Sequence, residues 1–279
     1  MGVLIKRFAM AAAVALSCAS SGSANVATMR WQTFEEGLAA APRTNRPILL
    51  DFWADWCAPC KVMDADVYTK DEVVRAAEPF VAVRIDYDRK PALARRYGVA
   101  DIPTIVVTDS YGSELFRYTG YLDAAAFREM LGSLPRDVTE FNRLTRALER
   151  DRHDFSALGE LAGRLRSAGL FLTSNGYYAR ALETREARAD ASAREAILTA
   201  TSANYLDVKD GRRAAVTLER CLKEFPKSAR EGAWTLDLGR AYLLDGKKAK
   251  ARARLQDVVR RHAGTAEAAE ATSLLASIG

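Results

Sequence analysis

The sequence predicts an α/β domain, in which helices cover a mixed sheet, followed by an all-α domain of helical hairpins. Short apolar runs alternate with helical patterns up to about residue 135, whereas strand-like runs disappear from about residue 139. Hydrophobic residues make up 49% of the 279-residue chain and charged residues 28%, a composition that suits two globular domains. We therefore expect one domain over residues 28–135 and a second over residues 139–279.

The first residues have the pattern of a secretory signal peptide. Lys6 and Arg7 precede an apolar run at 8–16, and small or polar residues follow up to Ala24. The run is shorter than the ~20 residues of a membrane-spanning helix. We expect residues 1–24 to direct export, to a bacterial periplasm, with a buried N-terminal helix as the alternative interpretation.

A lipid anchor is a second possibility for the same segment. The sequence Ala-Leu-Ser-Cys at 15–18 loosely resembles a bacterial lipoprotein box, although the leucine normally stands one residue earlier. A lipidated Cys18 would tether the protein to a membrane surface. A membrane-anchored lipoprotein is therefore the alternative localisation.

The first domain contains four strand-like runs and five helical patterns. The strand-like runs are 48–53, 81–85, 104–107 and 114–118. The helical patterns are 31–41, 61–67, 71–77, 91–97 and a final one that Asp123 caps and that ends near residue 134. This alternation, closed by a hairpin, predicts a mixed sheet with helices on its faces.

The second domain is punctuated by a repeated signal. Asp-Gly followed by two basic residues and alanine occurs at 210–214 and again at 245–249, and an amphipathic stretch follows each time. A period of about 34 residues with paired helices is typical of tetratricopeptide repeats. We therefore expect about three tetratricopeptide-like hairpins that bind a protein partner, with an irregular helical bundle as the alternative.

The charge distribution argues against nucleic-acid binding. The formal net charge is only +5, and the basic residues are scattered along helical patterns. We expect them to form a solvated surface.

The cysteines do not form a disulfide framework. They are Cys18 in the signal region, the close pair Cys57 and Cys60, and the isolated Cys221. Cys221 has helical spacing with apolar neighbours, which predicts a buried structural thiol. The close pair is therefore either redox-active or metal-binding.

Redox chemistry is the better interpretation of Cys57 and Cys60. A structural zinc site needs four ligands, and the two histidines, His153 and His262, both lie in the helical half. Haem attachment needs a histidine after the second cysteine, where Lys61 stands. We expect no metal and no cofactor other than a redox-active Cys57–Cys60 disulfide.

The setting of the pair suits a reactive thiolate. Cys57 follows a buried strand and opens a helix, where unpaired N–H groups and the helix dipole stabilise negative charge. Two intervening residues bring Cys60 within disulfide reach across one helical turn. Pro59 suits the first helical turn because its missing N–H is not needed there.

Two separated motifs now carry a family resemblance. Trp-Cys-Ala-Pro-Cys-Lys at 56–61 and Ile-Pro-Thr at 102–104 match the two hallmark sites of the thioredoxin family. Residues 30–134 resemble a thioredoxin domain. The sequence around the motif is most similar to exported members such as the C-terminal domain of bacterial thiol:disulfide interchange proteins.

The resemblance implies catalytic roles for three residues. Cys57 would be the exposed nucleophile that forms a mixed disulfide, and Cys60 the buried resolving thiol. Asp51 takes the place of the family's buried acid, which accepts the Cys60 proton through water. A carboxyl group in an apolar strand should have a raised pKa, which suits proton transfer near neutral pH.

The resemblance also implies a substrate-binding surface. Pro103 would be a cis proline that faces the disulfide, and Ile102 would offer backbone hydrogen bonds to a substrate chain. Trp56 would shield the site, with Ala58 and Pro59 beside it.

One position departs from the family pattern. Ala82 stands where cytosolic thioredoxins usually carry a lysine near the buried acid. The sequence therefore does not indicate how far the pKa of the Asp51 carboxyl group is shifted.

The function that follows is disulfide reduction or interchange in exported proteins, with a membrane thiol reductant to regenerate the dithiol. A disulfide oxidase or isomerase stays open, because direction depends on the reduction potential. A repeat scaffold with a redox-regulated head is a third, non-enzymatic alternative.

Overall fold

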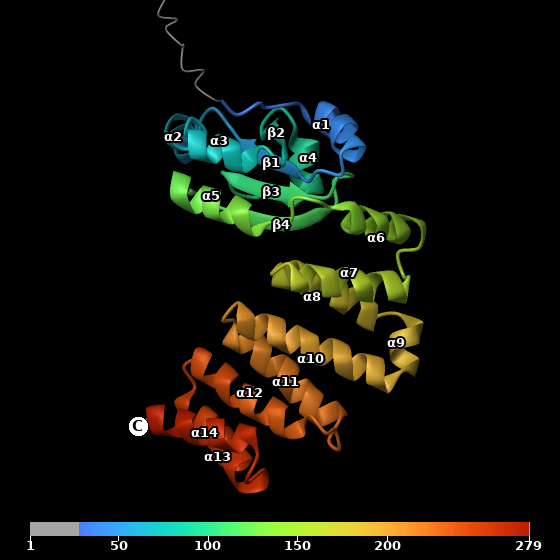
Figure 1. The fold of residues 1–279 in the computed structure, drawn as a ribbon, viewed down its shortest axis with the longest axis vertical. Helices are drawn as coiled ribbons and strands as arrows, with labels where there is room; N and C mark the ends of the chain where they lie inside the picture. The colour runs from blue at the N-terminus through green and yellow to red at the C-terminus, as the bar shows by residue number, and fades with distance from the viewer. Residues whose placement is uncertain (1–27, 279) are drawn as a thin grey trace, which may run out of the picture.

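The computed structural model describes residues 28–278. The expected signal peptide at 1–24 and the expected lipidation site Cys18 lie outside the described residues. Figure 1 shows a sheet-containing unit at one end of the molecule and a stack of helices that leads away from it to the C-terminus.

Four strands form one mixed sheet in the order β2-β1-β3-β4. β1 pairs with β2 in parallel and with β3 in antiparallel fashion, and β3 continues into β4 as an antiparallel hairpin. The mixed sheet predicted from the alternating runs is confirmed. The strands are β1 (Ile48–Trp53), β2 (Val81–Asp86), β3 (Thr104–Thr108) and β4 (Glu114–Thr119).

Helices cover both faces of this sheet (Figure 1). One apolar cluster joins one face of the sheet to α1 and α4, through residues such as Phe34, Leu50 and Tyr97. Another joins the opposite face to α2, α3 and α5, through residues such as Leu49 and Phe127. The helices are α1 (Phe34–Ala40), α2 (Ala58–Asp66), α3 (Asp71–Ala77), α4 (Pro91–Arg96) and α5 (Ala124–Ser133), with a 3₁₀ turn η1 (Ala41–Arg43) after α1.

The first helix begins later than the spacing at 31–41 predicts. Thr33 caps α1: its hydroxyl accepts the Glu36 N–H at 3.3 Å, and the Glu36 carboxylate accepts the Thr33 N–H at 2.9 Å. Gln32 forms a bridge to Val83 on β2 and so extends the sheet edge. Trp31 therefore lies outside the helix and packs edge-on against Tyr68.

The second half of the described chain is helical, as predicted, and successive helices pack against one another (Figure 1). Within residues 28–278, no helix is both long and apolar enough to cross a bilayer. The helices are α6 (Thr139–Arg150), α7 (Phe155–Ser167), α8 (Phe171–Leu182), α9 (Arg185–Ala189), α10 (Ala191–Asp207), α11 (Gly211–Glu224), α12 (Glu231–Leu244), α13 (Lys248–Arg261) and α14 (Ala266–Ile278).

The apolar core crosses the boundary expected at residues 135–139. One cluster contains Phe127 of α5, Val138, Phe141 of α6 and Leu158 of α7. Burying one such side chain contributes about 1.5–3 kcal/mol. The sheet-containing unit and the first helices after it are therefore held together by shared packing, and the division into 28–135 and 139–279 stays a prediction.

Buried polar groups lock α6 onto the end of the sheet. Asn142 accepts the Ser110 N–H at 3.0 Å and donates to Asn45 Oδ1 at 3.1 Å. The Thr145 hydroxyl donates to the buried Asp109 carboxylate at the β3–β4 turn. Any other position of α6 on the sheet would leave these buried polar groups without partners. Because such groups are costly, the bonds favour this one position.

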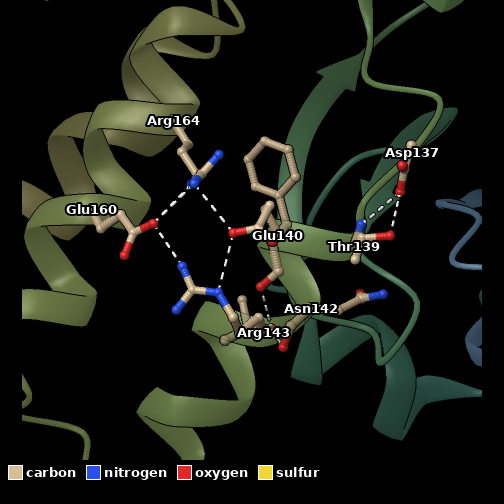
Figure 2. A network of polar contacts seen from close by, with 9 residues as sticks. Asp137, Thr139, Glu140, Asn142, Arg143, Glu160 and Arg164 are labelled. Carbon is tan, nitrogen blue, oxygen red and sulfur yellow. Dashed lines mark hydrogen bonds and ion pairs between the residues drawn. The ribbon is translucent and has the colours of Figure 1, made fainter.

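Figure 2 shows a closed ring of four charged side chains that connects α6 to α7. Arg143 and Arg164 each contact both Glu140 and Glu160, at N–O distances of 2.6–3.2 Å. All four are exposed to solvent, which screens their charges, so each pair contributes little to stability. The ring helps to orient α7 on α6 but contributes little to the free energy of unfolding.

The close approach of α11 to α12 depends on Gly211. A Cβ atom there would lie 2.4 Å from the Ala241 carbonyl oxygen and 2.6 Å from Leu244 Cβ. We predict that Gly211→Ala lowers the free energy of unfolding by roughly 1–3 kcal/mol through overpacking. Urea unfolding monitored by far-UV circular dichroism measures this.

The matched control is Gly176→Ala, because a Cβ atom at that exposed position of α8 meets no atom within 4 Å. Helix propensity predicts that this change stabilises the protein by up to about 1 kcal/mol. Equal unfolding midpoints for Gly211→Ala and Gly176→Ala would contradict the packing argument.

Candidate active site

The site forms at the junction between the end of β1 and the start of α2. The Cys57 N–H donates to the Ala54 carbonyl at 3.1 Å, which turns the chain after the strand. Cys57 is the N-cap of α2, and its Sγ accepts the Cys60 N–H at 3.2 Å. The two cysteines form a disulfide, with their Cα atoms 5.3 Å apart. The predicted position of Cys57 at a helix N-terminus is confirmed.

This geometry favours a thiolate at Cys57 once the disulfide is reduced. The Cys60 N–H and the positive end of the α2 dipole both face the Cys57 sulfur, and each stabilises negative charge. Pro59 stands in the first turn of α2, where its missing N–H leaves no bond unmade. The arrangement therefore supports a nucleophilic sulfur.

Cys57 is less exposed than the family resemblance implies. In the disulfide form the residue is only 2% exposed. Cys57 and Cys60 are packed in a small apolar cluster with Ala54, Trp53, Tyr87 and Ile102. Tyr87 and Trp53 were not singled out from the sequence, and they cover the disulfide because β1 and β2 both end beside it.

The expected shielding role of Trp56 stays a prediction. Its side chain is 65% exposed, and its indole N–H donates to Asp88 at 2.9 Å, which holds the ring at the surface. Ala58 and Pro59 are exposed next to it. These three residues form an accessible apolar surface beside the disulfide.

The second motif lies against the same cluster. The Ile102–Pro103 peptide bond is cis, and the chain enters β3 directly after it. Ile102 packs on the disulfide cluster, whereas Pro103 is buried and its carbonyl accepts the Gly120 N–H at 2.9 Å. The two sequence motifs, more than forty residues apart, therefore meet at the disulfide.

Asp51 lies within β1 and is 2% exposed. Burial raises the pKa of its carboxyl group to about 7, while the charge of Arg84 lowers it and the charge of Asp64 raises it. The rise expected for a carboxyl group in an apolar strand is thus present.

Arg84 is the residue that sequence reasoning missed. It is the cross-strand partner of Asp51 in the β1–β2 register, and its Nε lies 3.2 Å from Asp51 Oδ2. Its Nη2 lies 2.6 Å from Asp64 Oδ1. The lysine missing at Ala82 is therefore replaced by a cation two residues later in the same strand.

A signal for this pair was present in the sequence. The two strand-like runs at 48–53 and 81–85 each carry one charge at the fourth position, Asp51 and Arg84. Parallel pairing of the two runs from their first residues places these charges side by side, as the structure has them.

The remaining candidates lie elsewhere. Cys221 is buried among the helices α11 and α12, and burial raises the pKa of its thiol to about 12. His262 contacts Glu231 at 2.8 Å on the helical array. Within residues 28–278, no group of three or more His, Cys, Asp or Glu side chains is placed to hold a metal ion.

Comparison with known proteins agrees with this geometry. The family profile described as a thioredoxin-like domain matches residues 34–135. A thioredoxin of Mycobacterium bovis is 38% identical over 93 residues, which cover 33% of this chain and 78% of that protein.

Longer and solved relatives were also found. The thiol:disulfide interchange protein DsbD of Cronobacter sakazakii is 36% identical over 95 residues, which cover 32% of this chain but only 17% of that relative's length. The reduced C-terminal domain of Neisseria meningitidis DsbD is 30% identical, with a TM-score of 0.32, and the match covers 35% of this chain and 90% of that domain.

The family profile covers the region that carries Asp51, the Cys57–Cys60 pair and Pro103, and the helical region follows it. The chain therefore belongs to the thioredoxin family of protein-disulfide oxidoreductases.

Proposed function

We propose that the protein is an exported thiol–disulfide oxidoreductase that reduces or interchanges disulfides of exported proteins. The observation that carries the proposal is the Cys57 sulfur at the α2 N-terminus, bonded to Cys60 and accepting its N–H. The signal-like pattern at 1–24 supports export to a periplasm. A membrane thiol reductant would supply the electrons.

The exchange proceeds in two steps. The Cys57 thiolate attacks one sulfur of a substrate disulfide, a Cys57–substrate bond forms, and the other substrate sulfur leaves as a thiolate. Cys60 then gives its proton to the Asp51 carboxylate and attacks Cys57 Sγ. The Cys57–Cys60 bond forms as the second substrate sulfur leaves, so two electrons pass to the substrate.

The exposed residues beside the disulfide suit a protein substrate. Trp56, Ala58 and Pro59 offer an apolar surface, and Ile102 supplies backbone groups next to the disulfide. An extended substrate segment would lie across these residues and place its disulfide against Cys57.

The helical region supports a repeat interpretation. In α12 and α13, Leu238-Gly239 with Tyr242, then Ala251 with Leu255, reproduces the L-G-x₂-Y and A-x₃-F spacing of tetratricopeptide repeats. A Cβ atom at Gly239 would lie 2.7 Å from a Leu255 methyl group, which explains the glycine. Two preceding hairpins carry buried residues at the matching positions of their second helices: Ser174, Tyr178 and Ala181, then Ala214, Leu218 and Cys221.

A protein partner on these helices is part of the proposal. A cavity of about 500 Å³ lies between α10, α12 and α14, and its lining combines four leucines with Asp207, Asp237 and Arg240. Stacked hairpins present such surfaces to protein ligands. If partners bound here more or less tightly when Cys57–Cys60 was reduced, and the protein did not reduce their disulfides, a redox-regulated scaffold would be the better description.

We predict that Cys57→Ser abolishes the acceleration by this protein of insulin reduction with dithiothreitol, because the attacking sulfur is lost. Cys60→Ser should retain the first step and accumulate mixed disulfides that non-reducing electrophoresis detects. Cys221→Ser, which changes the buried thiol outside the site, is the control. An unchanged insulin rate in Cys57→Ser would rule out the proposed chemistry.

The pKa of Asp51 has a consequence for stability. Since the folded protein holds this proton up to about pH 7 and the unfolded chain releases it near 3.8, the free energy of unfolding falls as pH rises between these values and is constant above them. Roughly three pH units at about 1.4 kcal/mol each give a loss of about 4 kcal/mol.

We therefore predict that Asp51→Asn removes this fall, so that the variant is the more stable protein above pH 7 while its reductase rate drops. Urea unfolding at pH 5 and pH 8 measures the first effect and insulin turnover the second. A parallel pH dependence of stability in wild type and variant would contradict the raised pKa.

The direction of electron flow is tested by the reduction potential of the Cys57–Cys60 couple against glutathione. A reductase should have a potential near that of thioredoxin, about −270 mV, whereas a value near −120 mV would identify an oxidase. Values between these limits, with reshuffling of scrambled substrates, would favour an isomerase.

A further inference from the structure

Helix α13 has the largest excess of positive charge among the described helices. Within Lys248–Arg261, lysine and arginine outnumber aspartate and glutamate by five, an excess as large as that of the entire chain. The neighbouring helices α12 and α14 each have an excess of acidic residues. The positive charge of the protein is therefore concentrated at the end of the helical array, away from the sheet (Figure 1).

The basic residues border the exposed face of α13 on both sides. The helix buries an apolar stripe against α12 and α14, formed by Ala251, Leu255 and Val258. The opposite face carries Ala249, Ala253, Gln256 and Arg260, all exposed. Since positions three and four apart share one side of a helix, the other basic residues form two exposed rows beside this face. One row contains positions 248 and 252, and the other contains positions 250, 254 and 261.

Three of these cations have no ion-pair partner within residues 28–278. Lys248 and Arg254 make no ion pair there, and Lys250 lies over the Tyr242 ring, 5.5 Å from its centroid. One carboxylate faces the same row, because the Tyr242 hydroxyl donates to Glu219 of α11. The row nevertheless keeps a net positive charge.

The paired cations lie at the other end of the helix. Arg260 and Arg261 both contact Asp257, and Arg261 also contacts Glu231 of α12 at 2.9 Å. The charge without an ion-pair partner therefore lies in the first two turns of α13.

We propose that the exposed face of α13 docks on an anionic lipid surface. Lysine and arginine are long enough to extend past the short alanine side chains between the two rows, so both rows can reach one plane. A bilayer with anionic headgroups offers such a plane of negative charge, and each nearby cation adds to the attraction. Lipid docking of this face does not depend on the redox chemistry of the proposed function.

The shape of the face favours a lipid surface over a protein partner. The cavity on the helical array is lined by α10, α12 and α14, and α13 contributes no residue to it. An acidic protein would have to match the spacing of both rows, whereas lipid headgroups move laterally to meet the cations. Because the sheet and α2 lie at the opposite end of the molecule, docking through α13 leaves the disulfide uncovered (Figure 1).

Co-sedimentation with lipid vesicles tests the proposal on residues 25–279. This chain contains every residue that the structure describes and lacks both the apolar run at 8–16 and Cys18, which could bind lipid by themselves. We expect binding to vesicles of equal parts phosphatidylglycerol and phosphatidylcholine, weakening as salt rises because salt screens exposed charges. Vesicles of phosphatidylcholine alone should not bind the protein.

The variant Lys248→Gln/Lys250→Gln/Arg254→Gln should bind the anionic vesicles roughly 100-fold more weakly, since each cation near the surface contributes about a factor of five. Glutamine suits exposed helix positions, so the fold should be kept, and the far-UV circular dichroism unfolding midpoint checks this. Lys248→Gln and Arg254→Gln singly, each with a loss of about fivefold, keep the test decisive if the triple variant does not fold.

The matched control is Lys70→Gln/Arg95→Gln/Arg128→Gln. It removes the same charge from exposed positions of the sheet-containing unit, none of which makes an ion pair within residues 28–278. Its affinity for anionic vesicles should stay within about twofold of wild type, since cations far from the docked face lie beyond the screening length.

Three results would overturn the proposal: equal binding to both kinds of vesicle, an unchanged affinity in the α13 variants, or the same loss in the control as in the α13 triple variant. Binding of polyglutamate through the same three residues, without vesicle binding, would assign the face to an acidic polypeptide and overturn the lipid proposal. A protein that binds anionic vesicles through α13 but does not reduce insulin would refute only the proposed function.

Discussion

The candidate site depends on one constraint, the burial of strand β1 over Ile48 to Phe52. It is hydrogen-bonded on both edges, to β2 and β3, and covered by helices on both faces. Such a strand must be apolar, because any polar group in it loses its water. Burial therefore raises the pKa of the single carboxyl group of Asp51 to about 7, and the cation beside it comes from the neighbouring strand.

The same strand delivers the cysteines. Because β1 ends directly before α2, the sulfur of Cys57 is placed on the open N–H groups of a helix, while Asp51 stays behind it in the sheet. One element thus gives an environment that favours a charged sulfur at its end and, within it, a carboxyl group that can accept or release a proton near neutral pH. Active sites that couple proton transfer to nucleophilic attack often contain two titratable groups whose pKa values are shifted in opposite directions.

Much of this could be predicted from the sequence, because the relevant signals are local. The buried run 48–53 and the helix start at Cys57 follow from apolar pattern and spacing, and the structure has them within a residue. What the sequence did not indicate depends on tertiary contacts: the packing of Tyr87 on the disulfide cluster, the hydrogen bond from Trp56 to Asp88, and the ion pair of Arg84. Each depends on side chains that are far apart in the sequence and come into contact only where β1 and β2 pair or end. Local sequence patterns do not reveal such contacts.

The apolar core that runs unbroken from α5 into α7 joins the sheet rigidly to the helical array. A flexible linker would let a client docked on the helices sample many positions around the disulfide, with an effective concentration set by linker length. With a rigid connection, the effective concentration is high where the geometry matches and close to zero where it does not. If clients dock on the helices as proposed, only those whose docking segment and cysteine are separated by a matching distance would react within the same complex, and the shared core would then select substrates by that distance.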